Sequence, residues 1–115
     1  ICRKSEYKTF NANKKIKSYS RTGQKYYENV FNFIEAKNND GANPLNKATY
    51  STELVVKLLD IYGTAGATVL DPFGGTGTTA VACKHKSINC VSIELSEAQC
   101  KYAKQRIESL EEVIK

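Results

Sequence analysis

Several residue types that often carry structure or chemistry are scarce in this sequence. It has two prolines, Pro44 and Pro72, which are not adjacent, and a single histidine, His85. No run approaches the ~20 apolar residues that a membrane-spanning helix needs, so no membrane partner is expected. His85 lies near the end of an expected helix, where it suits the helix dipole better than it suits metal binding or catalysis. These absences argue against a membrane protein and against a histidine-based active site.

The cysteines also lack the spacing of a metal site or a redox motif. There are four of them, and none forms a C-x-x-C pair: Cys2, Cys83, Cys90 and Cys100. Cys90 falls in an expected core strand and Cys83 on an expected helix. We therefore expect free thiols in a reducing cytosol, and no bound metal.

The positive charge of the chain is concentrated in its first quarter. The formal net charge is +5, of which residues 1–26 carry +7 and the remainder −2. Single aromatic residues are spread through this segment, which has no helical or alternating periodicity. Such a composition suits contacts with nucleic-acid phosphates and stacking on bases. A solvated basic arm is the open alternative. The residues expected to contact phosphates are Lys14, Lys15, Lys17 and Arg21.

After residue 28, hydrophobic patterns typical of strands and helices alternate. Strands are expected at 29–34, 67–70 and 90–93, and helices from Ser51 or Thr52 to about Tyr62, over 78–86, and from Ser96 onward. The first helix has an apolar stripe: Leu54, Val55, Leu58, Leu59 and Tyr62. Ser96 and Gln99 form a capping box at the start of the last helix. The alternation predicts an α/β fold with parallel strands joined by right-handed crossovers.

The most informative stretch runs from Val69 to Ala80 and reads V-L-D-P-F-G-G-T-G-T-T-A. An apolar strand leads into it and a helix leaves it, which is the opening of a nucleotide-binding α/β unit. Gly75, Gly77 and Ala80 fit the G-x-G-x-x-G/A spacing. Thr78 and Thr79 follow, instead of Lys-Ser/Thr, so the loop is not a phosphate-binding P-loop.

A second strand follows and ends in Glu94, 17 residues after Gly77. This is close to the ~20 residues expected for the acid that binds ribose hydroxyls in such units. The spacing therefore makes Glu94 a candidate ribose-binding residue. A structural glycine turn followed by a surface glutamate is the alternative.

The sequence D-P-F-G-G-T-G-T-T resembles the S-adenosylmethionine-binding motif of DNA methyltransferases that make N6-methyladenine or N4-methylcytosine. The resemblance extends downstream through Ile93-Glu94-Leu95, and more loosely upstream to about Tyr7. It implies that residues 28–115 form part of a class I methyltransferase, with a partial Rossmann-like parallel sheet and S-adenosylmethionine as cofactor. It also implies that residues 1–27 are the end of a target-recognition region or a linker.

The resemblance assigns roles to residues around the loop. Glu94 should accept hydrogen bonds from the ribose, and Asp71 should lie near the ammonium group of the methionine part. Phe73 should lie against the adenine or the methionine tail. The full expected set of cofactor-binding residues is Asp71, Pro72, Phe73, Gly74, Gly75, Gly77, Thr78, Thr79, Glu94, Ala48, Thr49 and Tyr50.

The last three of these residues come from a weaker match. In the family, an element of the form His-Pro-Ala-x-Phe-Pro closes over the methionine part of the cofactor. Residues 46–51 read N-K-A-T-Y-S, so only Ala48 is identical and Tyr50 keeps the aromatic. A plain loop before the helix remains the alternative.

The family's catalytic pattern, Asp/Asn/Ser-Pro-Pro-Tyr/Phe/Trp, is absent because the two prolines are not adjacent. In one branch of the family this pattern precedes the glycine loop. The chain is therefore expected to be the C-terminal portion of such an enzyme, as a fragment or as one subunit of a split enzyme. It should carry no catalytic residue and be inactive alone. Its expected partners are double-stranded DNA and the missing catalytic half.

Three other functions remain open on the sequence. An RNA or protein methyltransferase can share the cofactor loop. A dinucleotide-dependent oxidoreductase is disfavoured, because dehydrogenase fingerprints lack the Asp71-Pro72-Phe73 that precedes the loop here. A non-catalytic methyltransferase-like module that binds DNA is the third.

Overall fold

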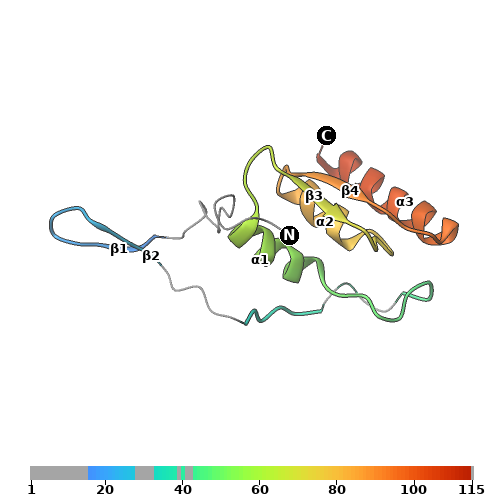
Figure 1. Cartoon of the computed structure of the whole chain (residues 1–115), viewed down its shortest axis with the longest axis horizontal. Coiled ribbons are helices and arrows are strands. Elements are labelled where there is room, and N and C mark those ends of the chain that lie inside the picture. Colours follow the sequence, from blue (N-terminus) through green and yellow to red (C-terminus); the bar gives the residue numbers. More distant parts are fainter. Residues whose placement is uncertain (1–15, 28–32, 39, 41–42, 115) are drawn as a thin grey trace, which may run out of the picture.

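The structure is a computed structural model that describes residues 16–27, 33–38, 40 and 43–114 (Figure 1). The elements after residue 50 follow the expected order of helices and strands. They are α1 (Thr52–Tyr62), β3 (Thr68–Asp71), α2 (Thr78–His85), β4 (Asn89–Ser92) and α3 (Glu97–Ile114). Their bounds differ from the expected ones by at most one residue. The order confirms the predicted α/β fold.

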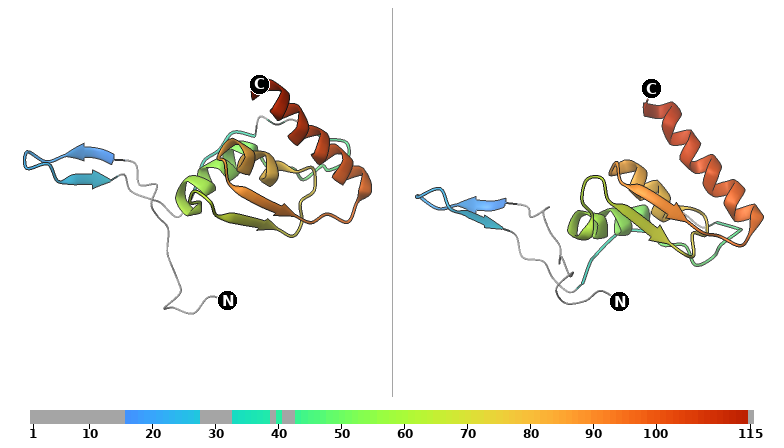
Figure 2. Two further views of the ribbon diagram at one scale, coloured as in Figure 1. Left: turned by 90° about the horizontal axis from the view of Figure 1, so that it is seen from above. Right: turned by 45° about the horizontal axis from the view of Figure 1, so that its top comes forward.

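Strands β3 and β4 pair in parallel, and α2 is the crossover between them. In the register, Val69 lies beside Cys90 and Leu70 beside Val91. Val69 and Cys90 pack against the core, with α1 and α2 on that side of the sheet (Figure 2). Leu70 and Val91 are 64% and 51% exposed. Within the described residues, the sheet is therefore covered on one face only.

A small apolar core joins the two helices to the covered face. Its buried residues are Val55, Leu59, Ala82, Cys83 and Ile88. Burial raises the pKa of the Cys83 thiol to about 11, so it stays protonated and behaves as a small apolar side chain. Cys83, Cys90 and Cys100 are all free thiols. Cys2 lies outside the described residues.

The basic segment contains an element that the sequence did not reveal. Strands β1 (Ile16–Tyr19) and β2 (Lys25–Tyr27) form an antiparallel hairpin that projects away from the helices (Figure 1). Ser20 closes its turn, because its Oγ accepts the N–H groups of Thr22 (3.2 Å) and Gln24 (2.9 Å). Strands of three and four residues are too short to produce a readable alternation.

The strand expected at 29–34 is not confirmed. Residues 29–32 lie outside the described residues, and Phe33 and Ile34 belong to no strand. The backbone of the residues that follow forms hydrogen bonds with side chains of α1 and not with a neighbouring strand. Lys57 Nζ donates to the Glu35 carbonyl (2.6 Å), and the Lys37 N–H donates to Glu53 Oε2 (3.2 Å). The aromatic and β-branched composition had favoured a strand, but long-range pairing decides where a strand forms.

Helix α1 starts as expected, with Ser51 as N-cap accepting the Leu54 N–H at 3.2 Å. Its buried stripe is narrower than predicted. Val55 is buried, whereas Leu58 and Tyr62 are 38% and 66% exposed. The reason is that α1 packs mainly against α2, so only the side facing that helix is covered.

The described part of the chain contains no helix long and apolar enough to cross a membrane. Among the same residues, no cluster of three or more histidine, cysteine or acidic side chains could hold a metal ion. His85 is exposed in the last turn of α2, as predicted.

Candidate cofactor site

The carboxyl ends of β3 and β4 meet at one edge of the sheet, as parallel strands require. Asp71 ends β3, and Glu94 follows β4 by two residues. The Ile93 N–H donates to the Asp71 carbonyl (2.9 Å), and the Gly74 N–H donates to the Ile93 carbonyl (2.8 Å). The glycine loop is thereby fastened to the end of the second strand, the position where ligands bind in open α/β sheets.

The two glycines of the loop with positive φ have different surroundings. Gly75 (φ +53°) and Gly77 (φ +84°) both adopt the left-handed conformation that favours glycine. A Cβ on Gly75 would lie 3.1 Å from Asn46 Nδ2 and 3.5 Å from Gln99 Oε1. A Cβ on Gly77 would lie 2.7 Å from the Cβ of Ala103. Gly75 therefore faces the polar side chains of Asn46 and Gln99, whereas Gly77 allows α3 to pack closely on the loop.

Glu94 binds backbone N–H groups on both sides of the site. Its Oε2 accepts the Gly75 N–H and its Oε1 accepts the Ser96 N–H, both at 2.8 Å. The bonds from Ser96 and then Gly75 hold the pKa of Glu94 below its ordinary value, so the carboxylate is ionised at neutral pH. Each carboxylate oxygen has a second lone pair, which leaves room for hydroxyl groups of a ligand.

The expected capping box at the start of α3 forms only in part. Ser96 Oγ accepts the Gln99 N–H at 3.4 Å. The reciprocal partner of the Ser96 N–H is Glu94 and not Gln99. Glu94 thus takes over a role that the local sequence had assigned to Gln99, and the Gln99 side chain turns toward Gly75.

Two buried acceptor atoms beside the loop have no hydrogen-bond partner among the described residues: Asp71 Oδ2 and Gln99 Oε1. The other Asp71 oxygen accepts the Phe73 N–H at 3.0 Å. Buried polar atoms are almost always paired, so unpaired acceptors at one place indicate that donors are supplied from outside. A ligand with ammonium or amino groups fits this requirement.

The segment before α1 reaches the start of α2 through Tyr50. The hydroxyl of Tyr50 lies 2.9 Å from Thr79 Oγ1, and Thr79 is buried in the first turn of α2. The Ala48 N–H donates to Asn46 Oδ1 (3.0 Å), and the Thr49 carbonyl accepts from Asn38 (3.4 Å). The Tyr50 contact joins this segment to the helix that follows the glycine loop, and the other two bonds fix the segment itself.

The turn between Asp71 and Gly74 carries the most exposed aromatic ring of the candidate residues. Phe73 is 85% exposed and follows Pro72, which is also exposed. Phe73 is therefore available for packing against a ligand or against another part of the protein. Leu95, next to Glu94, is fully exposed at the same edge of the sheet.

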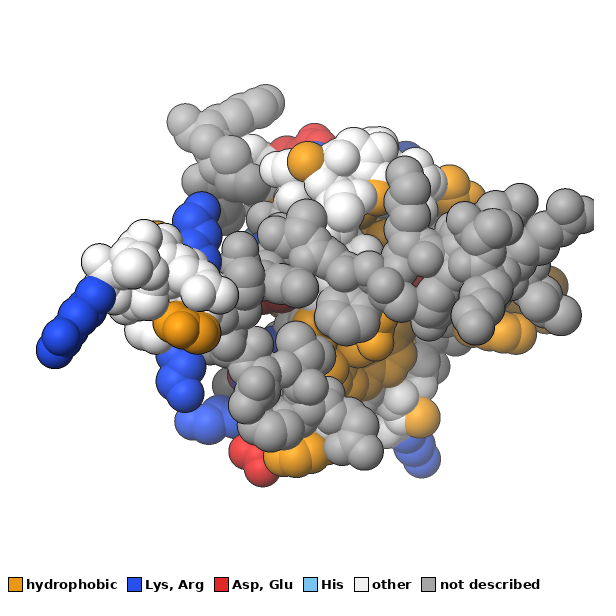
Figure 3. All heavy atoms as spheres, turned by 60° about the vertical axis from the view of Figure 1, so that its left-hand side comes forward, with side chains coloured by type: hydrophobic (Ala, Val, Ile, Leu, Met, Phe, Trp, Pro, Cys, Tyr) orange, Lys and Arg blue, Asp and Glu red, His pale blue; other side chains and the backbone are white. Residues whose placement is uncertain are grey.

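The basic candidates form a separate group on the hairpin. Lys17 lies in β1 and Arg21 in the turn, both exposed, and Lys14 and Lys15 lie outside the described residues. Figure 3 shows basic side chains projecting from the hairpin into solvent. The exposed rings of Tyr19 (61%) and Tyr26 (49%) accompany them.

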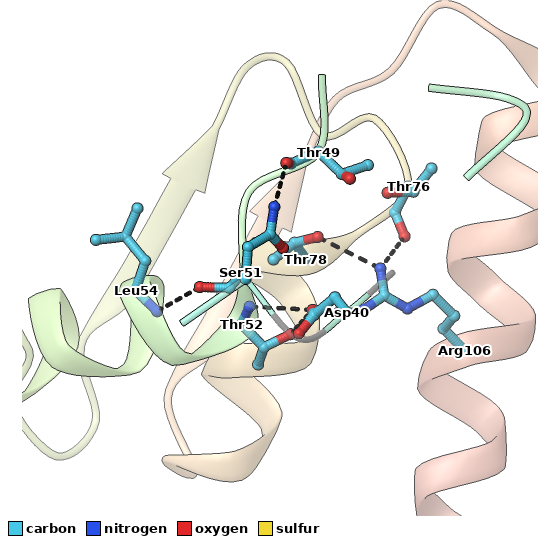
Figure 4. A network of polar contacts seen from close by, with 9 residues as sticks. Asp40, Thr49, Ser51, Thr52, Leu54, Thr76, Thr78 and Arg106 are labelled. Atoms are coloured by element: carbon cyan, nitrogen blue, oxygen red, sulfur yellow. Dashed lines mark hydrogen bonds and ion pairs between the residues drawn. The ribbon is translucent and has the colours of Figure 1, made fainter. Parts of the chain in front are cut away.

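The sequence analysis missed a polar network centred on Arg106 of α3 (Figure 4). Its Nη1 donates to the Thr76 carbonyl (2.9 Å) and to Thr78 Oγ1 (3.3 Å), and its Nη2 lies 3.5 Å from Asp40 Oδ2. The sequence did contain an indication that Arg106 is not an ordinary surface residue. Arg106 lies three residues after Ala103 and directly before Ile107, so a charged residue occupies the inward face of an amphipathic helix.

The fold, together with the edge of the sheet where β3 and β4 end, defines a nucleotide-binding α/β unit of the methyltransferase type. The family model described as DNA methylase, of the N6/N4 kind, matches residues 1–105. The chain therefore belongs to the N6/N4 DNA methylase family, as the glycine-loop resemblance predicted.

Curated relatives are type II methyltransferases. M.BsoBI of Geobacillus stearothermophilus is 33% identical over 91 residues, which are 78% of this chain and 15% of that protein. M.HpaI of Haemophilus parainfluenzae is 29% identical over 106 residues, covering 77% of this chain and 32% of that protein. M.SmaI of Serratia marcescens is 52% identical over 42 residues, 36% of this chain and 14% of that protein. The chain thus spans less than a third of each of these relatives.

Solved structures show the same fold. A DNA modification methylase of Thermus thermophilus, TTHA0409, in complex with S-adenosyl-L-methionine, has a TM-score of 0.51 and 33% identity. The match covers 52% of this chain and 25% of that one. M1.HpyAVI has a TM-score of 0.50 and 37% identity, over 52% of this chain and 30% of that chain.

Proposed function

We propose that this chain is the S-adenosylmethionine-binding part of a DNA methyltransferase that modifies the exocyclic amino group of cytosine (N4) or adenine (N6). The observation that carries the proposal is the convergence of Asp71, Gly75 and Glu94 at one sheet edge, with a buried acceptor left unpaired beside the loop. The family and the cofactor complex of a relative support it.

The residues present fit this cofactor chemically. Its ammonium group could satisfy Asp71 Oδ2, and its ribose hydroxyls could donate to the remaining lone pairs of Glu94. We expect the backbone of Gly75 to approach the ligand closely, since glycine has no side chain, and Phe73 offers an exposed ring. When bound, the cofactor supplies an electrophilic methyl group, and this chain holds and orients it.

The base-activating chemistry would come from outside residues 1–115. The amine to be methylated must be lined up with the methyl group and hydrogen-bonded so that its lone pair is free, and a duplex base must first be flipped out. The family's Pro-Pro-aromatic pattern does this, and it is absent here. A catalytic half, in the same polypeptide or a separate subunit, is therefore part of the proposal.

Double-stranded DNA is the proposed substrate, with Lys14, Lys15, Lys17 and Arg21 contacting phosphates. The exposed hairpin that carries Lys17 and Arg21 supports this role, because it is reachable by a large partner. Contacts of this kind position a protein on DNA and carry no sequence information.

The test of the cofactor site is Glu94→Ala, with Glu97→Ala as the matched control. Glu97 is an exposed acid three residues away, paired with Lys101 at 2.7 Å. Calorimetry with S-adenosylmethionine on the complete polypeptide should show about ten- to a hundredfold weaker binding for Glu94→Ala, since two hydrogen bonds to a charged group are lost. The control should bind as wild type does. Equal affinity of both variants would remove Glu94 from the site.

A further inference from the structure

Arg106 is the centre of a bridge between three segments that are distant in sequence. It extends from α3 and is only 23% exposed at its side chain. On one side it donates to the Thr76 carbonyl of the glycine loop. On the other it pairs with Asp40, which precedes α1. Figure 4 shows Arg106 pointing between these two groups.

The loop end of this bridge lies between the two glycines with positive φ. Thr76 is flanked by Gly75 and Gly77, so its peptide groups have few steric limits of their own. Ordering such a backbone is entropically unfavourable, and bonds from fixed groups make that order part of the free protein. The guanidinium holds the Thr76 carbonyl at 2.9 Å and Thr78 Oγ1 at 3.3 Å. Arg106 thus orients the loop that presents the Gly75 N–H to Glu94.

The other end of the bridge lies at the start of α1. Asp40 Oδ2 accepts the Thr52 N–H at 3.0 Å and also accepts from the Thr52 hydroxyl. Thr52 is the first residue of α1, and Tyr50, two residues earlier, contacts Thr79. The position of Asp40 is therefore coupled to the segment 48–50 that approaches the glycine loop.

We propose that Arg106 is a positioning residue that preorganises the cofactor site by joining the glycine loop to the segment before α1 through Asp40. This inference rests on the proposed function, because it takes S-adenosylmethionine as the ligand. Arg106 does not need to touch the cofactor. Its effect is to remove the cost of ordering both segments at the moment of binding.

The planar fork of arginine is essential to this role. Its donors reach a carbonyl and a hydroxyl on one side and a carboxylate on the other. A lysine has one ammonium group at the end of a flexible stem and cannot span both sides in a fixed geometry. Arg106→Lys should therefore recover only part of what Arg106→Gln loses.

The experiment measures S-adenosylmethionine affinity by calorimetry on the complete polypeptide, for wild type, Arg106→Gln, Arg106→Lys and Asp40→Asn. We expect about tenfold weaker binding for Arg106→Gln and about threefold for the other two, from the loss of preorganising bonds. Lys104→Gln, on the exposed side of α3, is the charge-matched control and should bind as wild type does.

Amide hydrogen exchange separates positioning from simple helix packing. Faster exchange in Arg106→Gln should be confined to residues 74–78 and 50–54, with α3 as protected as in wild type. Exchange raised along α3 alone, with unchanged affinity, would overturn the proposal. If Arg106→Gln does not fold, the Asp40→Asn variant provides the test. An Asp40→Asn variant that binds S-adenosylmethionine as tightly as wild type would show that the bridge has no positioning role.

The outcomes also separate this inference from the proposed function. A wild-type protein that binds no S-adenosylmethionine overturns both. A wild type that binds it, together with an Arg106→Gln variant of equal affinity, overturns the role of Arg106 alone and leaves the cofactor site standing.

Discussion

The carboxylate of Glu94 binds two backbone N–H groups that belong to different segments, one in the glycine loop and one before α3. These bonds favour the ionised form, which is why the pKa of Glu94 is lowered from its ordinary value of 4.5. A single side chain thus joins the glycine loop to the start of α3, and we propose that its remaining lone pairs bind the ligand. Its protonation should weaken both functions together.

This lowered pKa predicts a pH dependence with a definite sign. A carboxyl whose folded pKa is depressed contributes stability above its unfolded pKa and loses it as pH falls through the folded pKa. Wild type should therefore be more stable than Glu94→Gln at pH 7, and the difference should shrink as pH falls below about 4.5. Urea unfolding at pH 7, 5 and 3 measures it. A difference that is constant across this range would contradict the ionised pairing.

Gly77 gives a second prediction at the scale of one residue. Gly77→Ala places a side chain at φ +84° and brings its Cβ within 2.7 Å of Ala103 Cβ. Backbone strain and crowding together should lower the free energy of unfolding by about 2–4 kcal/mol. Gly66→Ala is the matched control, because φ is +77° there and nothing lies within 4 Å. It should cost about 1 kcal/mol from strain alone.

The crowding component of that loss can be checked separately. Combining Gly77→Ala with Ala103→Gly removes the Ala103 Cβ that the new side chain would contact. The double variant should therefore lose less free energy of unfolding than the two single variants lose in sum. Additive losses, measured by chemical unfolding, would show that contact with α3 does not limit residue 77.

At the scale of elements, the hairpin is the one that contacts the rest of the described chain least, and it carries exposed basic side chains (Figure 1). Strands this short derive little stability from their own pairing, so the turn bonds of Ser20 matter for their geometry. The hairpin holds Lys17 and Arg21 on one compact support. This arrangement is suited to contacts with a polyanion.

Neutralising Lys17 and Arg21 to glutamine should weaken binding to all duplexes alike. The slope of log affinity against log salt should become shallower by about two units, one per lost phosphate contact. Lys101 and Lys104, both more than 70% exposed on α3, provide a charge-matched control pair. Salt-titrated binding to several duplexes measures the effect. A loss restricted to one sequence would indicate base readout instead.

At the scale of the whole molecule, the parallel sheet of β3 and β4 has one face that no described residue covers. Parallel sheets are normally covered on both faces, yet Leu70, Val91 and Ile93 are each more than half exposed here. The chain spans less than a third of the length of two of its curated relatives, M.BsoBI and M.HpaI. Both facts agree with the proposal that a catalytic half lies outside residues 1–115.

The 115 residues alone should therefore transfer no methyl group to DNA from labelled S-adenosylmethionine. The proposed cofactor-binding residues, from Asp71 to Thr79 and Glu94, are present, but no Pro-Pro pair exists in the chain. Incorporation of label into DNA measures the activity, which should appear when the chain is joined to, or mixed with, a part that carries the missing motif. Turnover by these residues alone, with contaminating enzymes excluded, would refute the proposed division of the enzyme.

Local sequence was sufficient for features that depend on neighbouring residues. The glycine turn between a strand and a helix, the start of α1 at Ser51 or Thr52 and the order of helices and strands after residue 50 were all predicted correctly. Each follows from backbone preferences and apolar spacing within about ten residues. The family resemblance came from the same short stretch, D-P-F-G-G-T-G-T-T, and the family match over residues 1–105 confirms it.

Only the tertiary structure decided the features that depend on distant partners. The bond from Gly75 to Glu94 spans 19 residues, and that from Arg106 to Thr76 spans 30. The failed prediction of a strand at Phe33 and Ile34 has the same origin, since the backbone just after them, at Glu35 and Lys37, bonds to side chains of α1 and not to a neighbouring strand. Apolar spacing specifies which face of an element is buried, but it does not specify what packs against that face. Hydrogen bonds between segments form only after packing has brought those segments together, so no local pattern encodes them.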